Sequence, residues 1–345
     1  MSNSYNHNKV LLFLCMVVGT VFIASMRYGA VAVSWQEIAT AISKSLGKPS
    51  SAMTLHESIF LQIRFPRACL CLLAGASLAV AGVLLQALFR NPLVEPGLIG
   101  TSSGSAFGAG LYLVLGASFQ IHAGEWTLPI AACLGGILAT LLVVFLANSA
   151  ETGKTSITAL LLTGIAINSL FMSGVGFLSY IARDPQARSI TFWNLGTLSG
   201  ANWEAVVALS VVFFLCMLLA LRHAKELNTL MLGEEEAAYL GTNIAQLKRN
   251  VILLNVLLVG VTTAFVGVIG FVGLIAPHMI RLVSGSDNRH LIYGSALCGA
   301  ILLTMADLTA RLLLKPAELP IGIVTSMVGV PIFILLLKKG KSYFF

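Results

Sequence analysis

Few residues of this chain could carry chemistry, because the sequence is 57% hydrophobic and only 10% charged. Ionisable groups inside apolar segments are the first candidates for function, and Asp307 is the clearest of them. Arg311 follows four residues later, so the two side chains would share one face of a helix. An ion-coupling carboxylate and a structural ion pair both fit this spacing. A proton-driven carrier would be expected to show several more acids or histidines within its apolar segments.

No pattern in the sequence indicates an enzyme or a metal site. There is no nucleophile with its base, and no pair of carboxylates in one apolar stretch. The six cysteines all lie in apolar runs without C-x-x-C spacing, which indicates buried thiols and argues against disulfides or zinc. His278 follows Pro277 near the end of an apolar run and is better explained as a packed or turn-capping residue. We therefore expect this chain to bind no metal and no cofactor itself.

Two further kinds of ligand can be set aside. Gly153-Lys154-Thr155 imitates the end of a Walker A loop, but that motif needs a glycine where this chain has Asn148 and a strand where it has an apolar helix. The net charge of +7 comes from basic residues scattered through loops and segment ends, with no basic stripe. Neither nucleotide binding by this loop nor nucleic-acid binding is therefore expected.

The longest polar interruption of the apolar pattern is residues 227–249. Glu234, Glu235 and Glu236 precede two alanines, and Gly241 then breaks the segment, which predicts two short helices around a glycine. This segment must lie in water. It could be a solvated connector with ordinary surface charges, or a rigid knob through which a soluble ATP-driven motor acts on a membrane protein.

The composition places the chain among integral membrane proteins, since its mean hydropathy is +0.90 and its charged fraction is far below the usual quarter. With roughly 20 residues for each crossing, the sequence predicts an all-α protein of about ten transmembrane helices in one domain, 1–345. The expected spans are 10–26, 66–88, 98–116, 128–147, 156–181, 204–221, two within 251–283, 291–313 and 319–337.

The loops complete this topology. Residues 30–63 are expected to carry a short amphipathic surface helix, and 182–203 to form a structured outer loop. Small residues within 66–88 predict close helix packing. An even number of spans puts both termini on one side, and a modest excess of Lys and Arg makes that side the cytoplasm.

Four motifs give the chain a specific resemblance that covers nearly its whole length. They are Arg64-Phe65-Pro66-Arg67, the turn from Gln86 to Gly97, the segment from Gly270 to His278, and Ala317 to Gly322. With these motifs the chain resembles the permease subunits of bacterial ABC importers for iron siderophores, haem and cobalamin, the FecCD-type family. The resemblance implies a multi-pass protein of the bacterial inner membrane, embedded in membrane lipid, with ten membrane helices and no catalytic residues of its own.

The same resemblance implies partners. A second permease copy would complete a homodimer, although pairing with a similar permease stays open. Two cytoplasmic ABC ATPase subunits would bind ATP and Mg²⁺, and a periplasmic or lipid-anchored substrate-binding protein would deliver the solute. The segment 227–249 would then be the ATPase contact, with short cytoplasmic coupling helices.

Positions that match the family's motifs can be given expected roles. The expected ATPase-coupling residues are Glu235, Ala237, Ala238 and Gly241. Those near the cytoplasmic gate are Asn91, Leu93, Thr155 and Ser156. The expected outer patch for the binding protein is Arg64, Arg67 and Arg311, and membrane-interface anchoring is the alternative role for the first two.

The expected substrate is haem. The outer stretch R-S-I-T-F-W-N-L-G resembles haem permeases more than cobalamin permeases. Arg183 and Arg188 could attract two propionates, while Phe192 and Trp193 could offer flat apolar surface to a porphyrin. The alternatives are an interfacial anchor for Trp193 with solvated arginines, a ferric siderophore or cobalamin as the solute, and, more distantly, an ion-coupled secondary carrier.

Overall fold

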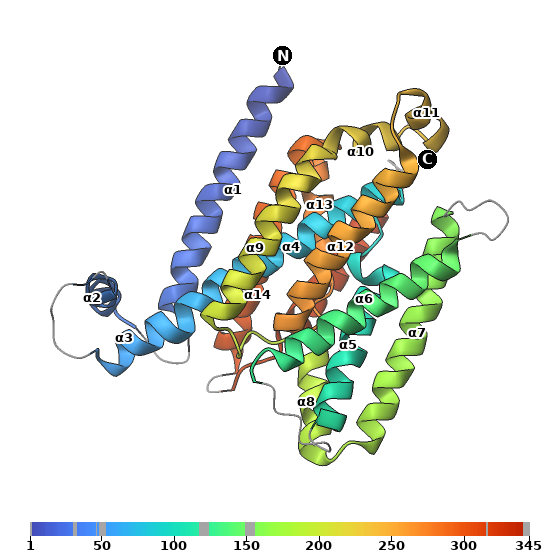
Figure 1. Ribbon diagram of the computed structural model, residues 1–345. Helices are drawn as coiled ribbons and strands as arrows, with labels where there is room; N and C mark the ends of the chain where they lie inside the picture. Colours follow the sequence, from blue (N-terminus) through green and yellow to red (C-terminus); the bar gives the residue numbers. More distant parts are fainter. Residues whose placement is uncertain are drawn as a thin grey trace.

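The computed structural model describes residues 2–29, 33–45, 47, 53–116, 124–148, 156–314 and 317–340, and there the chain is a bundle of helices (Figure 1). Within these residues, seven helices are long and apolar enough to cross a membrane. They are α1 (Ser2–Arg27), α4 (Phe65–Leu88), α6 (Thr127–Ala147), α7 (Ile157–Ile181), α9 (Trp203–Arg222), α12 (Ile244–Val266) and α14 (Asn288–Leu313).

Three further helices correspond to the remaining predicted spans. They are α5 (Thr101–Leu111), which continues as a π-helix over Tyr112–Gly116, α13 (Val272–Ser284) and α15 (Ile321–Gly340). Each of the ten spans expected from the sequence thus has a helical counterpart in the described part of the chain. The all-α membrane fold is confirmed.

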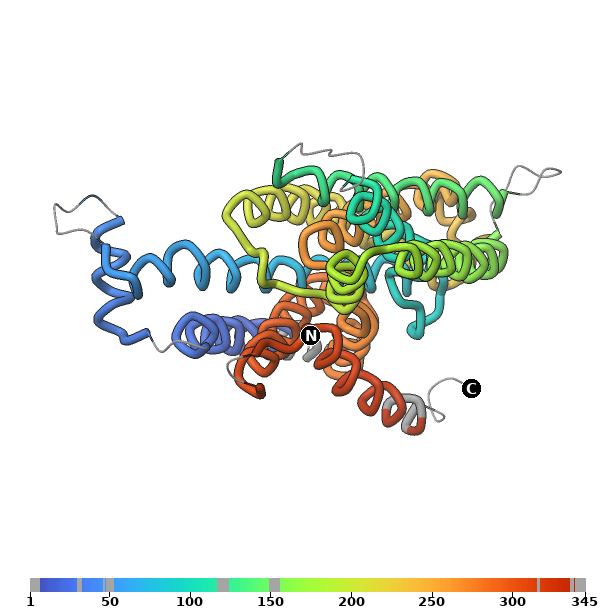
Figure 2. Tube along the Cα trace, turned by 90° about the horizontal axis from the view of Figure 1, so that it is seen from below, coloured from blue at the N-terminus to red at the C-terminus, as the bar shows by residue number. Residues whose placement is uncertain are grey.

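Helix α4 runs through the middle of the bundle, between α1, α14 and α15 on one side and α6 and α9 on the other (Figure 2). Its small residues permit backbone contact. A Cβ on Gly75 would lie 2.3 Å from the carbonyl oxygen of Gly299 on α14, and one on Gly82 would lie 1.9 Å from that of Gly273 on α13. The predicted close packing of this helix is confirmed, and it holds α13 and α14 against the centre of the molecule.

The N-terminal end of α4 differs from the sequence prediction. Pro66 was expected to begin the span, but the helix is continuous from α3 (Leu55–Ile59) through a π-helical turn at Phe60–Arg64. In that turn the Phe65 N–H donates to the carbonyl oxygen of Phe60. The wider turn lets the chain carry a proline, which has no N–H to donate, without ending the helix.

The long apolar run after residue 250 is divided as predicted. Helix α12 ends at Val266, and α13 begins at Val272. Gly267 has φ +71°, and a Cβ there would lie 2.3 Å from the carbonyl oxygen of Trp193, so only glycine fits. Phe271 also has a left-handed backbone, φ +69°, which is unusual for a bulky residue and marks the break as a constrained element.

The polar segments form short helices at the two ends of the bundle (Figure 1). The predicted surface helix is α2 (Trp35–Ser45), and the outer loop contains α8 (Asp184–Asn194). At the end that carries the N-terminus, α10 (Ala224–Leu230) and α11 (Glu234–Tyr239) are separated by Gly233, whose φ is +142°. The expectation of two short helices around Gly241 is therefore wrong in position, because Gly241, with φ +86°, ends α11 before α12 begins.

Candidate functional site

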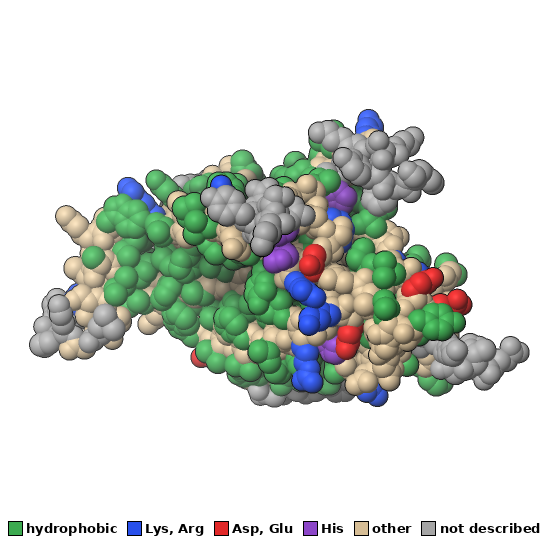
Figure 3. Space-filling model, turned by 90° about the horizontal axis from the view of Figure 1, so that it is seen from above, with side chains coloured by type: hydrophobic (Ala, Val, Ile, Leu, Met, Phe, Trp, Pro, Cys, Tyr) green, Lys and Arg blue, Asp and Glu red, His purple; other side chains and the backbone are tan. Residues whose placement is uncertain are grey.

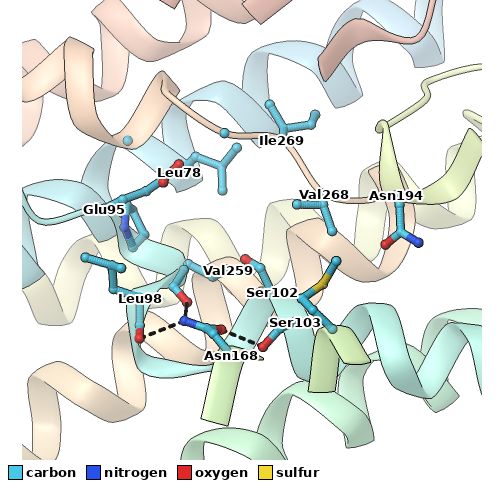
Figure 4. Close-up of a pocket in the computed structure, with 15 residues that line it drawn as sticks. Leu78, Glu95, Leu98, Ser102, Ser103, Asn168, Asn194, Val259, Val268 and Ile269 are labelled. Atoms are coloured by element: carbon cyan, nitrogen blue, oxygen red, sulfur yellow. Dashed lines mark hydrogen bonds between the residues drawn. The ribbon is translucent and has the colours of Figure 1, made fainter. Parts of the chain in front are cut away.

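A cavity of about 300 Å³ lies where α5, α7, the turn at Pro96–Ile99 and the α12–α13 break meet (Figure 4). Most of its wall is apolar, but several polar side chains line it, and we call it the polar cavity for these. The polar side chains that line it are Glu95, Ser102, Ser103, Asn168 and Asn194. Its volume is at the low end of the range for ligand pockets, so it suits one edge of a large solute.

Glu95 joins two elements that are distant in the sequence. Its Oε1 accepts a hydrogen bond of 2.9 Å from the N–H of Phe271, the strained residue of the α12–α13 break. Burial raises the pKa of the Glu95 carboxyl, and the Phe271 N–H opposes this shift only in part. The neutral form of this side chain is therefore favoured compared with an exposed glutamate, and a neutral carboxyl can donate a hydrogen bond as well as accept one.

The two asparagines differ in how they are used. Asn168 on α7 donates to the carbonyl oxygen of Leu98 at 3.0 Å and accepts from the hydroxyl of Ser103, so it fixes α7 against the turn (Figure 4). Asn194, at the end of α8, has a buried Oδ1 with no hydrogen-bond partner within the described residues. A buried acceptor without a partner is costly, which makes this amide a candidate contact for a solute.

The side chains of this cavity are suited to binding a solute through hydrogen bonds. One carboxyl, two amides and two hydroxyls can exchange hydrogen bonds with polar groups on a solute. Among the residues that the structure describes, no three His, Cys, Asp or Glu side chains come together to hold a metal ion. One residue of this cavity carries a signal in the sequence, because Asn168 is a polar residue inside an apolar span.

Residues 227–249, the expected ATPase contact, form an exposed knob. Figure 3 looks onto this end of the molecule and shows charged and histidine side chains gathered beside hydrophobic surface. Ala237 is fully buried, whereas Glu235 and Ala238 are exposed and Tyr239 is 90% exposed. A salt bridge of 2.8 Å from Lys248 to Glu234 fixes α11 to the start of α12. A rigid, exposed, partly apolar knob on the aqueous side suits a protein partner.

The expected gate residues lie at this same end. Asn91 Oδ1 accepts a hydrogen bond of 3.0 Å from the Leu93 N–H, which forms the turn after α4. Gln86, one turn earlier, places its amide 3.4 Å from the carbonyl oxygens of Gly273 and Leu274, so this turn is tied to α13. Ser156 is exposed just before α7. Thr155 lies outside the described residues.

The three arginines expected to form an exposed docking patch are buried instead. Arg64, Arg67 and Arg311 are 6%, 8% and 4% exposed. Arg67 contacts Asp307 and Glu318 at 2.9 Å each. Arg311 Nε lies 2.9 Å from the other oxygen of Asp307, so the ion pair between residues 307 and 311 that the sequence allowed is present.

Arg64 and Arg311 also hold the end of α1. Arg64 donates to the carbonyl oxygen of Arg27 at 2.7 Å, and Arg311 donates to the hydroxyl of Ser25 at 2.8 Å. Gly29 passes between them, since a Cβ there would lie 2.8 Å from Arg64 Nη2. Carbonyl groups at a helix C-terminus attract cations, which explains why these arginines turn inward. These inward contacts leave no open arginine patch in this structure. Docking of a binding protein at these residues stays a prediction, and so does the alternative of interface anchoring.

Of the four outer-loop residues that were expected to face a solute, only some are exposed. Arg183, Arg188 and Phe192 are exposed, and the Arg188 guanidinium lies 5.4 Å from the centre of the Phe192 ring. Trp193 is only 8% exposed and packs with Ile190 in the interior, because residues three apart share one face of α8. Trp193 therefore offers no flat surface to a solute, which corrects that expectation.

Comparison with known proteins gives consistent matches over the whole chain. The model of the FecCD transport family matches residues 14–339. The hemin transport system permease protein HmuU of Yersinia pestis is 39% identical over 333 residues, covering 96% of each chain. The vitamin B12 import system permease protein BtuC of Vibrio cholerae is 40% identical over 297 residues, covering 85% of this chain and 86% of the relative.

A solved structure shares the fold. It is described as an inward-facing conformation of a metal-chelate type ABC transporter, and it superimposes with a TM-score of 0.84 at 34% identity. The match covers 96% of this chain and 99% of that chain. The overall fold is therefore shared with a chain of an ABC transporter.

Proposed function

This chain belongs to the FecCD transport family, a family of ABC importer permeases in the bacterial inner membrane, and we propose that it translocates haem. The observation that carries the proposal is its similarity to a hemin permease along 96% of both chains. The outer stretch around Arg188 and Phe192 agrees with it, since a guanidinium on an exposed ring can bind a propionate beside an apolar plane.

The proposed role of this subunit is to change conformation when its ATPase partners hydrolyse ATP. ATP is hydrolysed by two ATPase subunits that dock on α11, with Glu235, Ala238 and Gly241 at the contact. A rigid salt bridge from α11 to α12 supports this assignment, because it can transmit a push from the knob into the bundle. From the adjoining α13, the hydrogen bond of Phe271 reaches Glu95, at the edge of the polar cavity.

We propose that two copies of the chain form the pathway and that the polar cavity contacts the solute within it. The Oδ1 of Asn194, unpartnered within the described residues, and the raised pKa of the Glu95 carboxyl support this role. An ionised carboxylate would repel haem propionates, whereas a protonated one can donate a hydrogen bond to them. Asn91, Leu93 and Ser156, with Thr155 outside the described residues, are proposed to line the cytoplasmic exit.

The docking role of the arginines is proposed in a changed form. Glu318 is the most exposed member of the ion-pair cluster, with 36% of its side chain accessible. An acidic residue of the substrate-binding protein could replace Glu318 on Arg67 during docking. Arg64 and Arg311 would then support Arg67 from within and make no contact with the binding protein.

A ferric siderophore and vitamin B12 remain the competing solutes, because BtuC relatives are as similar in identity as the hemin permease. The test is uptake by the complete complex, with its binding protein, into liposomes that are offered haem, a ferric siderophore or cobalamin in separate assays. We expect saturable uptake of haem alone. Uptake of the siderophore or of cobalamin without haem would overturn the substrate and leave the permease function intact.

A further inference from the structure

A second and larger concavity lies between α6 and α12, beneath α11. This α6–α12 groove has a volume of about 1350 Å³. Along α12 it extends from Ile244 to Leu257, which is about 20 Å at the rise of an α-helix. It therefore reaches from the coupling end of the bundle well into the apolar layer.

The deep part of the groove is apolar. Its wall contains Leu141 and Val144 of α6, and Leu253 and Leu257 of α12. Leu141 and Leu253 are 60% and 56% exposed, so the groove is open at the side of the bundle. In a bilayer the medium beside such a wall is hydrocarbon, and an acyl chain can lie against it.

The mouth of the groove is polar and carries basic groups. Lys248 is matched by Glu234 at 2.8 Å, and Glu235 offsets one more charge. Arg90 and Arg249, both exposed, leave a net positive charge at the mouth. Arg90 has φ +51°, a backbone conformation uncommon for arginine that tends to persist where the surroundings demand it.

An apolar slot with two arginines at its cytoplasmic end has the pattern of a phospholipid site. Guanidinium groups bind phosphate through two parallel hydrogen bonds. Basic pockets between membrane helices on this side of the bilayer recognise anionic head groups. We propose that the α6–α12 groove binds one anionic phospholipid, with its phosphate on Arg90 and Arg249 and an acyl chain along Leu141, Val144 and Leu253.

The site adjoins the coupling surface, because Glu235 and Ala238 of α11 form part of the same wall. A bound head group would therefore contact the element through which the ATPase acts. Anionic lipid in this groove should strengthen the coupling between ATP hydrolysis and transport.

The test uses the full complex in lipid nanodiscs and a phosphatidylglycerol probe with a photoreactive group on its acyl chain. Labelled peptides are mapped by mass spectrometry, and a phosphatidylcholine probe of the same chain is run in parallel. We expect labelling of α6 and α12 at the groove with the anionic probe. Arg90→Gln with Arg249→Gln should lower this labelling roughly thirtyfold, since each basic group near the surface contributes about 1 kcal/mol.

Two matched variants make the test decisive. Arg222→Gln with Arg289→Gln removes two exposed arginines outside the groove and should leave the labelling unchanged. Val144→Trp fills the apolar slot, leaves every charge in place and should abolish the labelling. Equal labelling by both probes, or no loss in either groove variant, would overturn the proposal. Displacement of the probe by inorganic phosphate alone would also overturn the proposal. So would absence of labelling because a second copy of the chain covers the groove.

Discussion

Arg67 and Asp307 are 240 positions apart in the sequence, yet Arg67 Nε and Nη2 both donate to Asp307 Oδ1, at 3.1 and 2.9 Å. Arg311 lies against the other oxygen of the same carboxylate. One fully buried acid thus sits between two arginines and joins the start of α4 to α14. Removing one member of a buried ion pair leaves the other charge buried without a partner. This destabilises the protein far more than replacing the whole pair by apolar residues would.

The first prediction concerns this cluster. Asp307→Ala should lower the free energy of unfolding by about 3–5 kcal/mol, because the buried Arg311 loses its counter-charge and the buried Arg67 keeps only Glu318. Glu318→Gln is the control, and it should cost less than about 1 kcal/mol, because its side chain is 36% exposed and its ion pair with Arg67 is screened by solvent. Thermal unfolding in detergent measures both. Equal losses for the two variants would contradict the account.

The second prediction concerns backbone packing around α4. Gly82→Ala should destabilise the protein by at least about 2 kcal/mol, because its Cβ would lie 1.9 Å from the Gly273 carbonyl oxygen and force α13 away. Gly19→Ala in α1 is the matched control, since a Cβ there meets nothing within 4 Å. The measurement is the melting temperature of each purified variant compared with that of the wild type. A stable Gly82→Ala protein would show that the two helices do not touch.

The third prediction is a pH dependence at Glu95. The folded protein raises the pKa of this carboxyl above its ordinary value of 4.5. The folded state therefore holds the proton more tightly than the unfolded state, so this residue's contribution to stability falls as the pH rises from about 4.5 to the raised pKa. Glu95→Gln keeps an oxygen for the Phe271 N–H and removes the titration.

The measurement for Glu95 is the difference in melting temperature between the wild type and Glu95→Gln at several pH values. The wild type should lose stability relative to the variant as the pH rises through this window. A difference that stays constant with pH, or that changes in the opposite direction, would show that Glu95 is ionised as readily as an exposed glutamate.

The fourth prediction concerns coupling. Glu235→Lys with Gly241→Val should leave the protein inserted in the membrane but should prevent ATPase association or uncouple hydrolysis from transport. The reason is that it reverses an exposed charge on α11 and strains a backbone with φ +86°. Glu204→Lys, an exposed acid at the start of α9, is the control. ATP-driven uptake equal to that of the wild type in the double variant would show that α11 is not the coupling element.

The helices were predictable because apolar run length and glycine or proline breaks are local properties. The division of 251–283 into two helices followed from the length of the run and from Gly267 in the sequence, whereas Pro277 lies inside α13 and does not end it. The burial of Arg67 was not predictable in this way, since its partners Asp307 and Glu318 lie 240 and 251 residues away. Neither was the continuous helix through Pro66, which depends on a π-helical turn.

The candidate site shows the same limit. Glu95 belongs to a motif visible in the sequence, but its bond to Phe271 joins residues 176 apart. Asn194 and Trp193 are neighbours whose roles depend on which face of α8 is turned inward. For Trp193 that face is the interior, where it packs with Ile190. Composition gave no information on this orientation, although the three-residue spacing of the two apolar residues could have suggested it.

The most direct test of the central claim compares two sets of proteoliposomes. One contains this permease with its ATPase subunits and binding protein, and the other contains the permease alone under a proton gradient. Haem should accumulate only in the first set and only when ATP is present. Haem uptake by the permease alone, driven by the gradient, would contradict ATP-driven import.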